Sequence, residues 1–210
     1  HLNPGQELTQ PEGDRDFRHG YQTIEKLAAA FGSRLLVKET GCGISRDVAR
    51  RLVECGVTNI DVSGLGGTSW IRVEQLRATH DASAQKSDFD SWGIPTAAAI
   101  LEVRSAVPQG VQLVASGGVR SGLDGAKALA LGANIFGMAL PIFRALQQSG
   151  VSGARELLRR IRFDLLRAHV LTGAKTPAEL QTRRRMINGE LKAWIDQIDL
   201  SNSIVSEKNA

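Results

Sequence analysis

Short apolar segments alternate with amphipathic segments over the first two thirds of the chain. Each apolar run ends in polar residues and glycine, and each amphipathic run carries apolar residues at helical spacing. The pattern predicts strands at 34–41, 57–64, 111–118 and 133–140, and helices at 45–56, 94–107, 121–132 and 141–150. This order is typical of a parallel sheet, and continuous apolar runs are typical of strands buried on both faces.

The helix predicted at 45–56 has clear ends. Ser45 is a suitable N-cap residue, and Gly56 is a suitable stop. Val48, Leu52 and Val53 lie on one face of such a helix, so this face is expected to pack against the sheet.

After residue 150 the strand signals stop. Helices are predicted at 154–171, from 176 onward and at 188–196, and the last ten residues are polar and expected to fray. We therefore predict a partial barrel at 1–150, followed by C-terminal helices of the same domain at 151–210.

The predicted fold class is α/β, a (β/α)8 barrel of which this chain supplies roughly the C-terminal half. A closed barrel needs eight strands and about 250 residues. Four strands are clear, and the opening segment is a candidate tail of another. Ligands of such sheets lie at the carboxyl ends of the strands. The residues with chemical character at these ends are Lys38, Glu39, Asp61, Ser63, Ser116, Gly117, Gly118 and Gly137.

The bulk properties narrow the class of protein. The 210 residues carry a formal charge of +4, with basic runs at 159–160 and 183–185. No stacking aromatics interleave with these arginines, which favours a solvated helix face over a nucleic-acid site. No apolar stretch is long enough to span a membrane, and a cytoplasmic location is the default. Cys42 and Cys55 show no metal-ligand spacing, although Cys42 lies in a glycine-rich loop near the expected site.

The segment ASGGVRSGLD at 115–124 predicts a phosphate site. Paired glycines let backbone N–H groups approach an anion, and the following helix start adds its dipole. GMAL at 137–140 ends a neighbouring strand, as in the phosphate cradle after strands seven and eight of a barrel. The alternative is a tight turn that needs glycine for its geometry alone.

Lys38 ends an apolar strand, where its charge can stabilise a negative group on a bound ring; the alternative is a surface lysine. The loop DVSGLGGTSW at 61–70 offers hydroxyls and glycines. It contains no G-x-G-x-x-G that opens a helix, so a dinucleotide fold is not predicted. WGIPTAA at 92–98 is interpreted as packing.

An ordered set of motifs resembles one family. The segments are HLNPGQE, PEGDRDF, VKETGCGIS, DVSGLGGTSW, WGIPTAA, ASGGVRSGLDGAKALALGA and GMAL. Together they resemble the type 2 isopentenyl diphosphate isomerases, which are FMN-dependent (β/α)8 barrels. In that family the HLNxxQE segment closes the fourth strand, so this sequence is expected to be the C-terminal part of a longer protein.

The resemblance implies an isomerase of isoprenoid biosynthesis. The family converts isopentenyl diphosphate to dimethylallyl diphosphate with reduced FMN and Mg²⁺, by adding a proton at one carbon and removing one from another. NADPH is the implied reductant, and a homo-oligomer is expected. The fragment alone is expected to be inactive.

The resemblance also implies roles for individual residues. Glu7 corresponds to the metal ligand, and Gln6 and Glu74 to the catalytic positions. His1, Asn3 and Gln6 correspond to substrate contacts. The implied flavin contacts are Lys38, Ser63, Thr68, Gly117, Gly118, Arg120, Ala139 and Leu140.

Two alternatives stay open. One is another FMN-dependent barrel, such as a 2-hydroxy-acid oxidase, which needs a histidine base beside an arginine near the flavin. The loop SGLGGTSW has neither, and His80 stands alone. The other is an inactive fragment, because half a barrel exposes open sheet edges.

Overall fold

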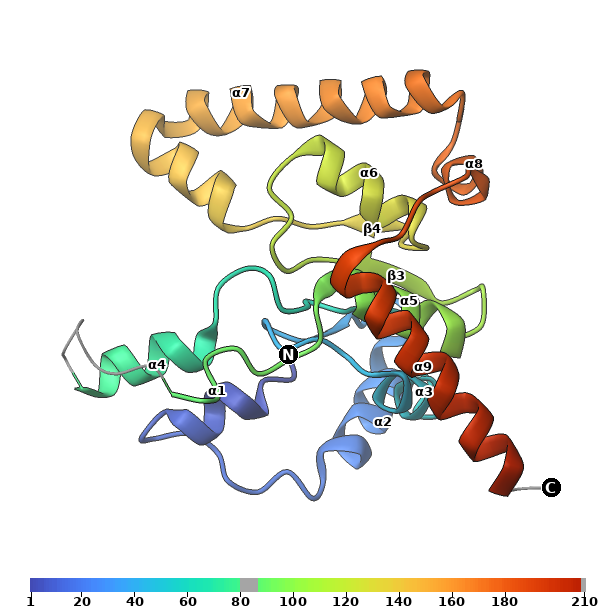
Figure 1. The fold of residues 1–210 in the computed structure, drawn as a ribbon. Helices are drawn as coiled ribbons and strands as arrows, with labels where there is room; N and C mark the ends of the chain where they lie inside the picture. The colour runs from blue at the N-terminus through green and yellow to red at the C-terminus, as the bar shows by residue number, and fades with distance from the viewer. Residues whose placement is uncertain (80–86, 209–210) are drawn as a thin grey trace.

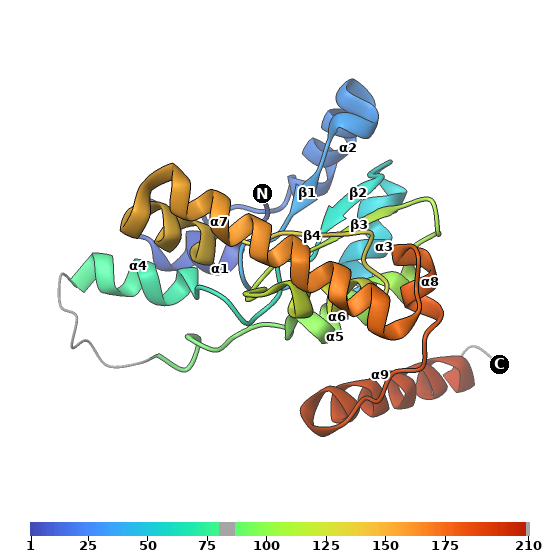
Figure 2. The same cartoon turned by 90° about the horizontal axis from the view of Figure 1, so that it is seen from above.

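A parallel sheet forms the centre of the protein. The computed structural model describes residues 1–79 and 87–208. Its strands are β1 (Val37–Lys38), β2 (Asn59–Asp61), β3 (Gln112–Ala115) and β4 (Ile135–Phe136), and they pair in the order β1-β2-β3-β4. Figure 2 shows them fanning out side by side. The α/β class and the parallel sheet are therefore confirmed, although each strand is shorter than predicted.

The opening segment extends the sheet beyond β1. Leu2 forms a parallel bridge with Glu39 and donates its N–H to the carbonyl of Lys38 at 2.6 Å. The opening residues therefore occupy the position expected of another strand's tail. At the other side of the sheet, Ile135 of β4 is 55% exposed.

Helices precede, connect and follow the strands. They are α1 (Pro4–Thr9), α2 (Gly20–Phe31), α3 (Arg46–Glu54), α4 (Trp70–Thr79), α5 (Thr96–Ala106), α6 (Gly122–Ala130), α7 (Leu140–Thr172), α8 (Pro177–Thr182) and α9 (Gly189–Lys208), with a 3₁₀ turn, η1, at Gly32–Arg34. In Figure 1, α6 and α7 lie on one side of the sheet, and α1 and α4 lie side by side at one end. No helix in the described ranges is long and apolar enough to cross a membrane.

The predicted limits of α3 are confirmed. The Ser45 hydroxyl accepts the N–H of Val48 at 3.4 Å, and Gly56 has a φ of 86° just after the helix. Leu52 is fully buried against the sheet.

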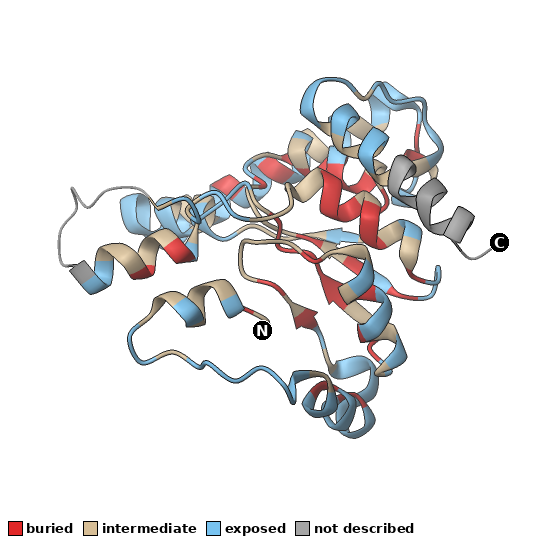
Figure 3. Cartoon of the chain, turned by 60° about the horizontal axis from the view of Figure 1, so that its bottom comes forward, coloured by how far each residue is buried: buried red, intermediate tan, exposed pale blue. Residues whose placement is uncertain are grey.

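The main core lies between the sheet and α3 and α5. Ile60, Leu113, Leu52, Ile100 and Val103 are at most 1% exposed. Full burial of each large aliphatic side chain contributes about 1.5–3 kcal/mol. Figure 3 shows that burial concentrates on the strands and on the helix faces turned toward them.

Five of the described helices depart from the predicted pattern. α1, α2 and α4 were not predicted, and α9 extends well beyond the helix expected at 188–196. α7 spans the two helices predicted at 141–150 and 154–171, with a kink at Ser149 and Gly150, where Gly150 has a φ of 61°. The division into 1–150 and 151–210 and the fraying of the last residues stay predictions.

Candidate functional site

A cleft of about 840 Å³ lies among the loops that follow the four strands, and we call it the glycine cleft. All eight residues predicted as flavin contacts line it: Lys38, Ser63, Thr68, Gly117, Gly118, Arg120, Ala139 and Leu140. They come from four loops that are far apart in the sequence, and the fold brings them together as the strand-end argument predicts.

The double glycine packs tightly against the neighbouring loop. Gly117 and Gly118 have φ values of 95° and 80°, and a Cβ on either would overlap the backbone of Gly64 or Gly66. Both glycines are therefore required by loop packing, whatever the cleft binds. Gly137 differs, since its added Cβ would meet only the Ser116 Cβ at 3.4 Å.

A buried carboxylate lies on the floor of the cleft. Asp61 is 5% exposed, and its carboxylate accepts the Ser116 hydroxyl at 2.8 Å and the Ser63 N–H at 3.1 Å. Burial raises the pKa of Asp61, while these hydrogen bonds and the nearby Lys38 charge oppose the rise. Ser63 has a φ of 36°, a left-handed conformation that is strained for a residue with a Cβ.

Two arginines that the sequence interpretation missed also line the cleft. Arg144 lies on the short first segment of α7, and Arg160 lies after the kink, which folds both segments toward the same space. Neither makes a hydrogen bond or an ion pair with any described residue. The solvated-face interpretation of 159–160 is thus incomplete: Arg159 pairs with Glu156, but Arg160 faces the cleft.

Arg120 and α7 close the far end of the cleft. The Arg120 guanidinium donates to the Gly66 carbonyl at 2.7 Å, which joins two of the loops. α7 begins at Leu140, and no side chain caps its first N–H groups. The first segment of α7 begins directly after β4, and a helix N-terminus beside the loops after the last strands matches the phosphate position of barrel enzymes.

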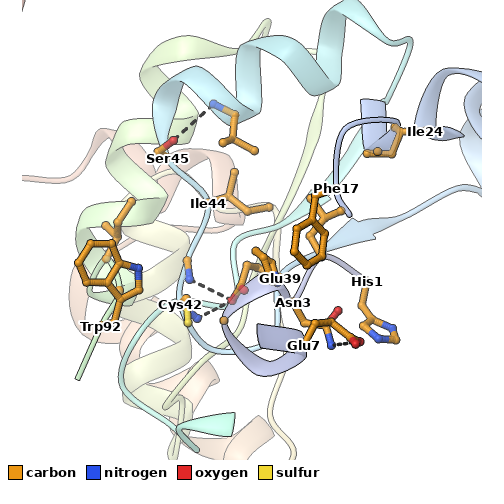
Figure 4. A pocket seen from close by; sticks show the side chains of 18 of the residues that line it. His1, Asn3, Glu7, Phe17, Ile24, Glu39, Cys42, Ile44, Ser45 and Trp92 are labelled. Carbon is orange, nitrogen blue, oxygen red and sulfur yellow. Dashed lines mark hydrogen bonds between the residues drawn. The ribbon is translucent and has the colours of Figure 1, made fainter. Parts of the chain in front are cut away.

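A second space of about 970 Å³, the N-terminal cavity, lies beside α1, α2 and the start of α3. His1, Asn3, Glu7 and Glu39 supply its polar side, as Figure 4 shows. Its apolar lining includes Phe17, Ile24, Ile44, Val48, Trp92 and Ile94.

The two predicted catalytic residues contact each other. The Gln6 amide donates to Glu74 Oε1 at 3.0 Å, joining α1 to α4 across 68 positions of sequence. Glu74 is 3% exposed, and its other oxygen lies 3.3 Å from Arg77 Nε. Asn3 donates to both Gln6 Oε1 and Glu7 Oε1 at 3.1 Å. We call Asn3, Gln6, Glu7 and Glu74 the amide–carboxylate cluster.

Glu7, the predicted metal ligand, is held by local donors. Besides Asn3, the backbone N–H of Asp14 donates to its Oε2 at 3.0 Å. Within residues 1–79 and 87–208, no group of three or more His, Cys, Asp or Glu side chains is placed to hold a metal ion. A site based on Glu7 would therefore take its other ligands from substrate phosphate and water, as Mg²⁺ commonly does.

Cys42 lines the N-terminal cavity. Burial, followed by the charge of Glu39, raises the pKa of the Cys42 thiol to about 11, so the thiol is neutral at physiological pH.

The segment 92–98 contributes to the glycine cleft as well as to packing. The Thr96 hydroxyl donates to the Gly117 carbonyl at 2.6 Å. The packing interpretation of WGIPTAA is therefore incomplete, because Thr96 also supports the glycine cleft. His80 lies outside the described residues.

Comparison with known proteins identifies relatives of this sequence. Residues 6–187 match a family model described as FMN-dependent dehydrogenase. An isopentenyl-diphosphate delta-isomerase of Pyrobaculum islandicum is 44% identical over 201 residues, covering 94% of this chain and 55% of that protein. The enzyme of that name from Geobacillus sp. strain WCH70 is 42% identical over 206 residues, covering 98% of this chain and 58% of that protein. The chain thus spans about half the length of the curated relatives it matches.

Solved structures support the fold. A lactate oxidase of Pediococcus acidilactici aligns with a TM-score of 0.60 at 20% identity, covering 83% of this chain and 42% of that one. At this identity the likeness concerns the fold alone, and it confirms the predicted barrel-type α/β architecture.

Proposed function

The chain belongs to the FMN-dependent dehydrogenase family and, within it, to the type 2 isopentenyl-diphosphate delta-isomerases, and on this premise we propose that its protein binds FMN and interconverts isopentenyl and dimethylallyl diphosphate. The glycine cleft is the proposed flavin site, and the N-terminal cavity with the amide–carboxylate cluster is the proposed substrate side.

One observation carries the proposal. The residues that the family resemblance assigns to the flavin come from four separate loops, and all of them line a single cleft. The cleft also fits the group chemically. Its volume lies within the range of cofactor sites, and its positive side chains suit a phosphate.

The lining suggests how FMN would be held. Lys38 would face the ring, and the hydroxyls of Ser63 and Thr68 would bind its polar atoms. Arg120, with the uncapped start of α7 at Leu140, would hold the phosphate. Arg144 adds a charge without a described partner at the same end of the cleft.

The reaction needs one proton added to the alkene and one removed from another carbon, with no net redox change. Bound FMN in its reduced form would supply a ring that can take part in this proton transfer. Glu74 is the chain's own candidate to accept or return a proton, because its buried carboxylate receives the Gln6 amide. Gln6 would orient that carboxylate, and Asn3 orients Gln6 in turn.

The remaining parts of the proposal concern the diphosphate and the reductant. His1 and Asn3 would donate to the diphosphate, and Glu7 would share Mg²⁺ with its oxygens. NADPH would reduce the flavin.

The lining also favours the isomerase over a hydroxy-acid oxidase. An oxidase of that kind needs a histidine base at the flavin. Within the described ranges, no histidine lines the glycine cleft.

The decisive experiment is an anaerobic assay of the intact protein with FMN, NADPH, Mg²⁺ and isopentenyl diphosphate. We expect dimethylallyl diphosphate to form in large excess over the NADPH consumed. Lys38→Ala should weaken FMN binding in a titration. Residues 1–210 alone should show no turnover. Oxidation of a hydroxy acid in proportion to flavin reduction would overturn the assignment.

A further inference from the structure

The segment 39–43, which we call the Glu39 loop, separates the two spaces. Thr40 and Gly41 line the glycine cleft, whereas Cys42 and Gly43 line the N-terminal cavity. Four consecutive residues therefore form a wall with one face toward each space. A shift of this wall changes the shape of both.

The Glu39 carboxylate holds the wall in place. Its Oε2 accepts the backbone N–H groups of Thr40 at 2.7 Å, Gly41 at 2.6 Å and Gly43 at 3.1 Å, and also that of Cys42. Figure 4 shows the carboxylate beside Cys42, between the loop and Asn3. Four donors that converge on one oxygen suit a charged acceptor, and such charge-assisted bonds are about twice as strong as neutral ones.

Backbone contacts fix Glu39 itself. It follows directly on β1, and its N–H donates to the Asp61 carbonyl at 3.2 Å. Its own carbonyl accepts the Lys38 ammonium at 2.6 Å, and Leu2 pairs alongside it. Glu39 is 5% exposed, and burial raises its pKa while the four N–H donors oppose the rise. The cost of burying this carboxylate is thus offset by the loop that it organises.

We propose that Glu39 is a positioning residue that sets the wall shared by the flavin and diphosphate sites. This role rests on the proposed function of the two spaces. It places a single carboxylate, which itself borders the N-terminal cavity, in control of both affinities through the backbone of the loop that it holds. Arg120, in contrast, lines only the glycine cleft, and Asn3 lines only the N-terminal cavity.

The test compares two isosteric substitutions in the intact protein, Glu39→Gln and Glu102→Gln, beside two alanine substitutions that each affect one space. Glu39→Gln removes the charge from the loop, and we expect the affinities for FMN and for inorganic diphosphate with Mg²⁺ each to fall by about tenfold. Arg120→Ala should lower only the first affinity, and Asn3→Ala only the second.

Glu102→Gln is the matched control. Glu102 is also buried, and its carboxylate accepts the Arg46 N–H at 3.1 Å, but it lines neither space. A general loss of stability would appear in both variants, whereas the paired loss of affinities should appear in Glu39→Gln alone. Hydrogen exchange should become faster at the amides of 40–43 in that variant.

The outcomes distinguish a failure of the proposed function from a failure of the proposed role of Glu39. An unmodified protein that binds neither probe overturns the proposed function and this role with it. If the unmodified protein binds both and Glu39→Gln binds them equally well, or loses only one, the role of Glu39 is wrong.

A second measurement covers a variant that fails to fold. In the unmodified protein, FMN and inorganic diphosphate, each added alone, should slow exchange at the same amides of 40–43. Protection by one probe only would contradict a shared wall.

Discussion

The glycine cleft and the amide–carboxylate cluster are built in different ways. The cleft owes its shape to backbone: Gly117 and Gly118 lie against Gly64 and Gly66 so closely that no Cβ fits between the loops. The cluster owes its shape to side chains, since Asn3, Gln6, Glu7 and Glu74 are held by hydrogen bonds among themselves.

This difference predicts opposite sensitivities. Adding atoms damages a site made of close backbone contacts, because nothing nearby can yield without moving a loop. Removing one polar atom damages a site made of paired side chains, because its buried partner loses a hydrogen bond.

The largest effect is expected for Gly118→Val. The new side chain would overlap the Gly66 backbone, and the φ of 80° is unfavourable for a β-branched residue. We expect loss of FMN binding together with a lower melting temperature, measured by titration and thermal unfolding.

Gly137→Ala is the control for this substitution, because a Cβ fits there and the residue lines the same cleft. It should melt within a few degrees of the unmodified protein. If Gly118→Val binds FMN as tightly as the unmodified protein, the backbone account of the cleft is wrong.

The second effect concerns Gln6→Met. Methionine has a similar size but cannot donate to Glu74, so the carboxylate loses its orienting partner. Turnover should fall by about a hundredfold, the range of general acid–base contributions. The FMN affinity should stay within about threefold, because Gln6 does not line the glycine cleft. If turnover and FMN affinity fell together, Gln6 would also act on the flavin site, and the contrast between the cleft and the cluster would be wrong.

A smaller effect is expected for Glu7→Gln. The substitution keeps an oxygen for the Asn3 amide but removes the charge of a hard ligand. The Mg²⁺ concentration for half-maximal activity should rise by about tenfold, with little change at saturating Mg²⁺. Unchanged activity at limiting Mg²⁺ would exclude a metal role for Glu7.

The smallest effect concerns the Cys42 thiol and pH. Its folded pKa of about 11 exceeds the ordinary value, so the neutral thiol favours the folded state. This contribution is complete below the unfolded pKa of about 8.5 and is lost as pH rises through about 11. In a Cys55→Ser protein, alkylation by iodoacetamide should be slow at pH 8 and should rise with a midpoint near 11. A midpoint near the ordinary thiol value would show that the Glu39 loop leaves Cys42 open to solvent.

The cleft was predictable from sequence because its signals are local. A strand end followed by two glycines, as at Gly117 and Gly118, identifies a loop, and parallel strands bring such loops to one edge. The sequence does not indicate that Arg160 lines the cleft, because only the kink at Ser149 and Gly150 brings the second segment of α7 toward it.

The cluster was predictable only through the family resemblance. The helix α4 has little amphipathic signal, so local pattern indicates neither the helix nor the burial of Glu74. The contact of Gln6 with Glu74 depends on the packing of α1 against α4, and the local sequence of neither helix indicates that packing. The sequence indicates Glu39 only as a strand-end residue, because the convergence of four N–H groups on its carboxylate depends on the loop conformation.

The order β1-β2-β3-β4 has a consequence for how the chain folds during synthesis. Each strand pairs with the one made just before it. The pairings of β1 with β2 and of β3 with β4 span only residues 39–58 and 116–134, whereas that of β2 with β3 must close the longer segment 62–111 and costs more chain entropy. We expect the sheet to grow on the ribosome one strand at a time, from β1 toward β4. The phosphate end of the glycine cleft, which needs β4 and the start of α7, would then be the last part of the site to form.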